Sequence, residues 1–135
     1  MFRLKRRLAP AVPDLQRKVP WPDGVFVSTE TEVVWHVLRG KKYRVFSPRV
    51  LDSWAVAPIQ GSGVSLSGLQ SGGILGFRAG TVIEDLSSGT IYLISNNKRR
   101  KITSPDVLLT LGLPIVTVSK AEADIHEDGD PIDVL

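Results

Sequence analysis

Four consecutive basic residues, Lys98-Arg99-Arg100-Lys101, form the group of side chains best suited to bind an anion. Clustered lysine and arginine side chains neutralise phosphates, which is the main source of affinity in nucleic-acid binding. The same run also suits an edge strand, where basic side chains prevent pairing with other sheets. We favour the edge strand, because strand geometry sends Lys98 and Arg100 to one face and Arg99 and Lys101 to the other. These four residues remain a candidate surface contact.

Few residues in this chain have side chains that could support catalysis or hold a metal ion. The sequence has no cysteine and two histidines, His36 and His126, and no acid–base pair is visible at sequence spacing. Residues 124–129 resemble the start of a calcium-binding loop, but Leu135 stands where that loop needs a glutamate. We therefore predict a protein that is not an enzyme and that has no cofactor and no metal site.

Charge is unevenly distributed along the 135 residues, whose net charge is +3. Residues 1–18 hold six basic residues against one aspartate, whereas residues 120–135 hold six acidic residues against one lysine. Three prolines interrupt the basic N-terminal segment, so a long helix is excluded there. We predict that residues 1–22 form an extended arm that docks on a neighbouring subunit, with nucleic-acid binding and disorder as alternatives. The contact residues expected are Arg3, Lys5, Arg6 and Arg7, with Trp21 as a hinge or anchor.

The sequence lacks the usual membrane and export signals. No apolar run approaches the ~20 residues that span a bilayer. The basic N-terminus is not followed by the apolar segment of about 7–15 residues that a signal peptide needs. We therefore expect no membrane span and no signal peptide.

A tandem repeat with a period of 57 residues organises the rest of the chain. The aligned pairs include Val34-Trp35 with Ile91-Tyr92, Lys41-Lys42 with Lys98-Arg99, and Ser47-Pro48 with Ser104-Pro105. We predict one repeat unit over residues 23–75 and a second over residues 76–135, the latter ending in an acidic C-terminal tail. Each unit is small enough that the two would share core surface.

The second copy shows the local structure of one unit most clearly. The segments "GTVIED", "TIYLIS" and "KRRKI" predict three strands, with a tight turn at Asn96-Asn97. Ser104 and Pro105 predict a helix start, and Gly112 its end. A strand "PIVTVS" and a short helix begun by a Ser119–Glu122 capping box complete a β-β-β-α-β-α unit. In the first copy the last part, "QGSGVSLSGLQSGG", predicts a loop. The expected fold class is therefore β-rich α+β, with two such units preceded by an extended N-terminal arm.

Residues 79–132 resemble a short repeat found in bacterial cell-surface proteins and in virion proteins of tailed phages. The shared pattern is "VYLI-x-NGKKRPI-S", followed by a short helix ending in "LG", a "VVVVSDAEL"-like segment and an acidic Gly-Pro ending. Residues 23–75 match it loosely. The chain departs from it at Asn97, where glycine is usual, and at Lys101, where proline is usual. The resemblance implies a β-rich adhesion or structural module without chemistry of its own.

From the resemblance and the charge pattern we expect a non-enzymatic virion structural protein of a tailed phage. It would belong to the tail or baseplate, the head–tail junction or the capsid decoration, and would be located in virions assembled in the host cytoplasm. Its partners would be other virion subunits in a homo- or hetero-oligomer, rather than nucleic acid. One alternative is a module that binds cell-wall or surface glycans through Trp35, Tyr92 or Trp54. A small nucleic-acid-binding protein is the third reading.

Overall fold

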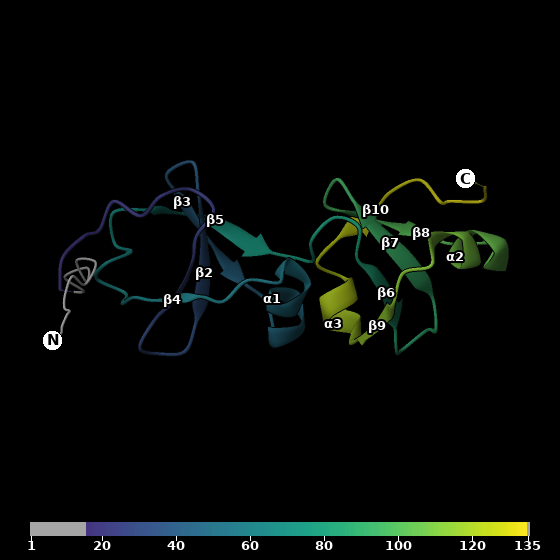
Figure 1. The fold of residues 1–135 in the computed structure, drawn as a ribbon, viewed down its shortest axis with the longest axis horizontal. Coiled ribbons are helices and arrows are strands. Elements are labelled where there is room, and N and C mark those ends of the chain that lie inside the picture. The colour runs from purple at the N-terminus through teal and green to yellow at the C-terminus, as the bar shows by residue number, and fades with distance from the viewer. Residues whose placement is uncertain (1–15, 135) are drawn as a thin grey trace, which may run out of the picture. The chain divides into compact units, whose positions relative to one another are not determined.

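The computed structural model describes residues 16–134 (Figure 1), so the predicted contact residues Arg3, Lys5, Arg6 and Arg7 lie outside the described part. The chain divides into two compact units. Of the described residues, the first unit, unit 1, holds 16–42 and 58–72. The second, unit 2, holds 43–57 and 73–134. This division does not follow the sequence repeats, because residues 43–57 of the first repeat pack within unit 2.

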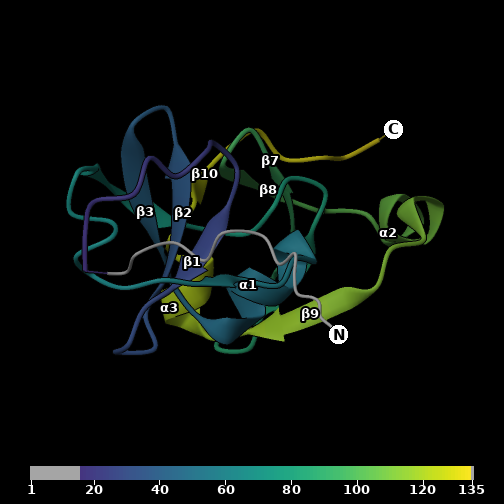
Figure 2. The same ribbon diagram turned by 60° about the vertical axis from the view of Figure 1, so that its left-hand side comes forward.

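Two five-stranded sheets have the same strand order, which confirms a β-rich α+β fold with two similar units (Figures 1 and 2). The first sheet has the order β4-β1-β2-β3-β5 and the second the order β9-β6-β7-β8-β10. The strands of the first are β1 (Phe26–Ser28), β2 (Val34–Leu38), β3 (Lys41–Val45), β4 (Ile59–Gln60) and β5 (Gln70–Leu75). Those of the second are β6 (Val82–Asp85), β7 (Ile91–Ser95), β8 (Lys98–Lys101), β9 (Ile115–Val118) and β10 (Glu127–Asp128).

The hairpin turns of the two repeats have the same backbone conformation. Both central residues have positive φ angles, 51° at Arg39 and 74° at Gly40, and 51° at Asn96 and 61° at Asn97. Two successive residues with positive φ match the right-handed twist of the strands that they join. Asparagine tolerates this conformation better than most residues. The predicted turn at Asn96-Asn97 is confirmed, and it fixes the register of β7 against β8.

The first two helices, α1 (Pro48–Trp54) and α2 (Pro105–Leu111), begin and end at equivalent positions. The side chain of Ser47 accepts a hydrogen bond from Val50 N–H, and that of Ser104 accepts one from Asp106 N–H. Each helix ends at a residue in the left-handed conformation, Ala55 or Gly112. These caps satisfy backbone groups that the helix itself leaves unpaired. The predicted start and end of the second helix are confirmed.

The segment at residues 62–67 is ordered, so the predicted loop in the first repeat is only partly right. Ser62 N–H donates to Ser65 Oγ, and Ser65 N–H donates to Ser62 Oγ, both at 3.0 Å. In the second repeat Ser119 and Glu122 exchange the same two bonds at the start of α3 (Lys120–Ala123). The Ser62–Ser65 pair of the first repeat therefore takes the place of the Ser119–Glu122 capping box, which lies 57 residues later in the second repeat.

Figures 1 and 2 show α3 and α2 on opposite sides of the second sheet.

The fifth strand of each sheet was absent from the predicted order. β10 pairs in parallel with β8, and Ile132 bridges to Ile102 further along. Thr103 N–H then donates to Ile132 O at 3.2 Å, and the equivalent bond in the first repeat joins Phe46 N–H to Leu75 O at 3.4 Å. The acidic segment predicted as a tail is thus paired with the second sheet as far as Ile132.

The core of unit 1 is built around Trp21, which is 8% exposed. Its side chain packs with Val27, Val37 and Leu66, and its Nε1–H donates to Ser65 O at 3.2 Å. Phe77, 56 residues later, is also buried. A buried aromatic residue therefore stands near the start of both repeats, Trp21 just before the first and Phe77 within the second.

Gly61 allows the close approach of segments in this core. A Cβ atom at Gly61 would lie 2.3 Å from Val27 Cγ1 and 3.3 Å from the Trp21 ring. We expect Gly61→Ala to lower the free energy of unfolding by about 1–3 kcal/mol, because neighbouring groups must shift. Gly68→Ala is the matched control, since its Cβ would meet only the Lys18 side chain at 3.5 Å. Urea unfolding followed by tryptophan fluorescence measures both, and equal losses would contradict the prediction.

Candidate anion-binding surface

The basic strand β8 lies between β7 and β10, so the prediction of an edge strand is wrong. β10 covers the outer edge, with Glu127 opposite Lys98 and Asp128 opposite Arg99. Sequence reasoning missed this strand because its two residues are acidic and have low β-propensity.

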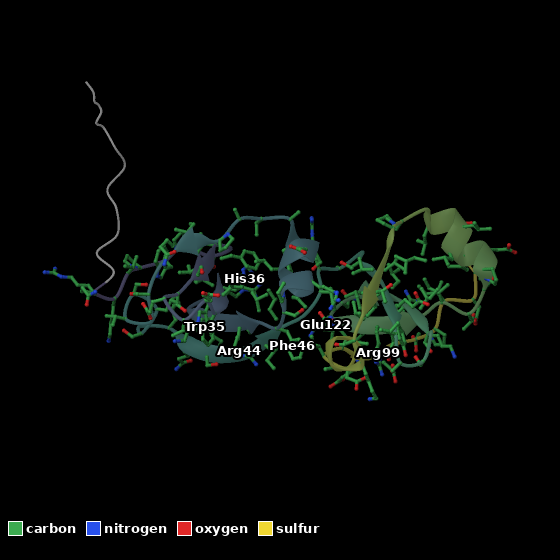
Figure 3. All side chains as sticks on the ribbon, turned by 90° about the horizontal axis from the view of Figure 1, so that it is seen from below. Trp35, His36, Arg44, Phe46, Arg99 and Glu122 are labelled. Carbon is green, nitrogen blue, oxygen red and sulfur yellow. The ribbon has the colours of Figure 1, made fainter. Side chains whose placement is uncertain are left out.

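Arg99, labelled in Figure 3, makes two side-chain hydrogen bonds to carboxylates, whereas Arg100 makes one to a backbone oxygen. The Arg99 guanidinium lies over the Tyr92 ring, 4.8 Å from the centroid, and its side chain is 17% exposed. Its Nε donates to Asp128 at 2.7 Å and one terminal nitrogen to Asp124 at 3.0 Å. Hydrogen bonds from Lys120 and Arg99 lower the pKa of the Asp124 carboxyl. The charge of Arg99 is therefore compensated within the chain.

The remaining basic residues of β8 follow the predicted alternation. Lys98 and Arg100 line one shallow hollow together with Gly129. Lys98 forms a 3.8 Å ion pair with Glu127, and Arg100 Nε donates to the backbone oxygen of Asp130 at 2.8 Å. Lys101 is exposed. Most of this run is therefore bound to the acidic C-terminal segment.

The equivalent strand in the first repeat, β3, has basic residues as β8 does, but the acidic residues that pair with β8 have no counterpart there. The ammonium of Lys42 lies 4.9 Å from the Trp35 ring centroid, as Arg99 lies over Tyr92, and Arg39 and Lys41 are exposed. The residues equivalent to Asp124, Glu127 and Asp128 are Ser67, Gln70 and Ser71. Within residues 16–134, no ion pair involves Arg39, Lys41 or Lys42. One acid, Asp23, is hydrogen-bonded to this hairpin: its carboxylate accepts from the backbone N–H of Arg39 at 2.8 Å.

The three aromatic residues considered for glycan binding are half-buried. Trp35 and Tyr92 each carry a cation over one ring face. Trp54 donates its Nε1–H to Gly76 O at 3.0 Å. Trp21, predicted to contact a partner, lies in the core of unit 1.

His126 is a buried structural residue of unit 2. Phe77 N–H donates to its Nε2 at 2.9 Å, so Nδ1 carries the proton and donates to Asn97 O at 3.0 Å. Burial lowers the pKa of His126, because the charged ring would lose water without gaining an acceptor at Nε2. Gly76 makes room for the ring, since a Cβ there would lie 2.5 Å from it.

The second histidine, His36, stacks on Phe26 with ring centroids 4.3 Å apart. Burial lowers its pKa as well. In the other repeat leucine occupies each equivalent position, Leu93 for His36 and Leu69 for His126. Both histidines therefore stand at positions where the fold also accepts an apolar side chain.

Glu122 joins α3 to the start of α1 inside unit 2 (Figure 3). Its carboxylate accepts from Ser47 Oγ at 2.5 Å, from an Arg49 guanidinium nitrogen at 2.9 Å and from Ser119 N–H at 3.0 Å. Burial favours the neutral acid, but hydrogen bonds from Ser119 and Ser47 outweigh it and lower the pKa of Glu122. Both oxygens of the Glu122 carboxylate thus accept hydrogen bonds, and these bonds hold α3 and the start of α1 together.

Neither a metal-binding cluster nor a membrane-spanning helix occurs in the described part of the chain. Residues 16–134 contain no group of three or more histidine and carboxylate side chains arranged to hold a metal ion. Their helices are too short and too polar to cross a bilayer. Comparisons with protein-family models, curated protein sequences and solved structures find no significant match to this chain.

Stability should fall in mild acid because the two buried histidines resist protonation. Each has a folded-state pKa below the usual 6.5, so the unfolded chain binds more protons as the pH drops. Their contribution is complete above about pH 7.5 and is lost progressively below about pH 6.5. We expect His126→Leu to flatten this pH dependence, while lowering stability at pH 7.5 by about 1–3 kcal/mol through two unpaired backbone groups.

Urea unfolding between about pH 7.5 and pH 5 tests this expectation. His36→Leu is the matched variant, since leucine also occupies that position in the other repeat. The double variant should lose most of the dependence in this range. A double variant with an unchanged pH dependence would show that other groups cause it.

Proposed function

We propose that this chain is a non-enzymatic structural protein of a tailed-phage particle. It belongs to the tail or baseplate, the head–tail junction or the decoration of the capsid, and it assembles with other virion subunits through its N-terminal arm. The resemblance of residues 79–132 to repeats of virion and cell-surface proteins supports this setting. The distribution of charge supports the assembly role.

That distribution is the observation that carries the proposal. Residues 16–135 contain thirteen basic and thirteen acidic residues, so the net charge of +3 belongs entirely to residues 1–15. A neutral folded part with a basic arm suits docking on an acidic surface of another subunit. Salt weakens exposed charge contacts, so such docking also needs apolar burial, for which Phe2, Leu4 and Leu8 are available.

The roles of the ionisable side chains support a structural protein rather than an enzyme. His126 and Glu122 are buried and bound to neighbouring backbone and side-chain groups. Asp124 and Asp128 are paired with Arg99. These contacts hold the fold together, and they leave the four groups engaged with neighbouring protein atoms.

Two alternative functions, glycan binding and nucleic-acid binding, make different demands on specific side chains. The glycan-binding reading is less favoured, because Trp35, Tyr92 and Trp54 are half-buried and a cation covers one ring face of Trp35 and of Tyr92. Nucleic-acid binding is favoured by one observation, the uncompensated cations of β3. It predicts an affinity that falls steeply with salt, and a gel shift that is absent or insensitive to salt would exclude it.

Removal of residues 1–15 should abolish incorporation into particles without unfolding the protein. The deletion stops before Val19 and Trp21, because both pack in the core of unit 1. The measurement is quantitative mass spectrometry of particles assembled with either the truncated or the full-length chain. A variant with Arg3, Lys5, Arg6 and Arg7 changed to glutamine keeps the length and tests the charge alone. Incorporation of the truncated chain at the full-length level would overturn the role of the arm.

A further inference from the structure

The two repeats contain the same cation–aromatic arrangement in two different electrostatic environments. In the second repeat Arg99 over Tyr92 binds Asp124 and Asp128. In the first repeat Lys42 over Trp35 stands at the equivalent place. The second repeat therefore shows which chemical group this arrangement accepts, namely a pair of carboxylates approaching from α3 and the fifth strand.

The backbone that carries those carboxylates is also present in the first repeat. Gln70 N–H donates to Gly40 O at 3.3 Å, which places the start of β5 beside the hairpin turn. Ser67 and Ser71 stand where the second repeat has its aspartates, and both are exposed. Short side chains at these positions fill less space than aspartate and bring no negative charge. Among the described residues, Lys42 therefore lacks the carboxylates that its counterpart Arg99 binds.

Two further basic residues belong to the segments next to this position within unit 1. Arg39 is exposed in the hairpin turn, whereas Lys41 faces the other side of β3 from Lys42. The aliphatic part of the Lys18 side chain lies alongside Gly68, 3.5 Å from the place of a Cβ atom there. We define the β3 basic surface as Lys18, Arg39 and Lys42 together with the Trp35 ring.

We propose that the β3 basic surface binds paired carboxylates of an acidic segment in a partner protein. Lys42 has three N–H donors, enough to bind two carboxylates as Arg99 does. The Trp35 ring holds the ammonium in place, so less side-chain freedom is lost on binding. A carboxylate ligand is favoured over a phosphate backbone because the equivalent arrangement in the second repeat holds two carboxylates. This inference rests on the proposed assembly function and adds a second contact to that of the arm.

The test supplies the missing acids from within the chain. In the variant Ser67→Asp/Ser71→Asp, the first repeat gains the carboxylates that the second repeat already has. A synthetic hexaglutamate peptide is the probe, and fluorescence anisotropy of the labelled peptide gives its Kd with the full-length chain. We expect the variant to bind at least about tenfold more weakly, because its own carboxylates occupy Lys42. Perturbed NMR signals of the Trp35 indole and of residues 39–42 should locate the site.

The control variant Leu109→Asp/Thr117→Asp adds the same charge at exposed positions of unit 2. It should bind the peptide within about twofold of the unchanged protein, since long-range effects are screened. The arm is present in all variants and can bind the peptide as well, so the Trp35 indole signal is used to follow binding at the β3 basic surface separately. Equal weakening in both double variants would overturn the proposal, because net charge alone would then explain the binding.

A reciprocal variant removes the carboxylates that bind Arg99 in the second repeat. Asp124→Ser/Asp128→Ser leaves Arg99 over Tyr92 without its carboxylates, and we expect it to bind a second hexaglutamate. A single-stranded oligothymidylate run in parallel distinguishes the ligand class. Binding of the oligonucleotide at Trp35 without binding of hexaglutamate would overturn the carboxylate ligand. If hexaglutamate does not bind but deletion of residues 1–15 still abolishes incorporation, this inference fails and the proposed function stands.

Discussion

The pairing of the fifth strand with the basic third strand is the interaction on which the second repeat depends. β10 covers the outer edge of β8, and its aspartate neutralises Arg99. Without this strand, four adjacent basic residues would lie along an open edge with mutual repulsion. The same pairing places the preceding residue, His126, between Phe77 and Asn97. One short acidic strand therefore closes the sheet, compensates its charge and fixes the buried histidine.

The two repeats show how one backbone arrangement can serve two electrostatic roles. Strand order, hairpin turns and helix caps are the same in both sheets, and the cation over the aromatic ring is kept. The acids are present in one repeat and replaced by serine and glutamine in the other. Because the buried side chains and the backbone ladder carry most of the stability, exposed side chains can differ without changing the fold. The basic strand of the second repeat is compensated by acids of the same repeat, whereas Lys41 and Lys42 of the first form no ion pair among the described residues.

Local patterns were sufficient to predict much of this fold. The repeat, the turn at Asn96-Asn97 and the Ser-Pro helix starts each depend on neighbouring residues, whose preferences act over a few positions. The fifth strands were not predictable, because "ED" has no strand pattern and "QSGGIL" is rich in glycine. The serine pair at residues 62–67 was missed for a related reason. Two serines give a weaker capping signal than serine with glutamate.

The sequence by itself determined the duplication, the order of the first elements in each repeat and the presence of a basic strand after the hairpin turn. These features follow from short-range conformational preferences and from an alternation that any strand must obey. Tertiary structure alone decided which cations are compensated, because Arg99 meets Asp124 and Asp128 across 25 and 29 residues of chain. It also decided that Trp21 is a core residue and that the acidic segment forms a strand. Charge pairing and burial between distant residues depend on the folded backbone, which composition and spacing do not specify.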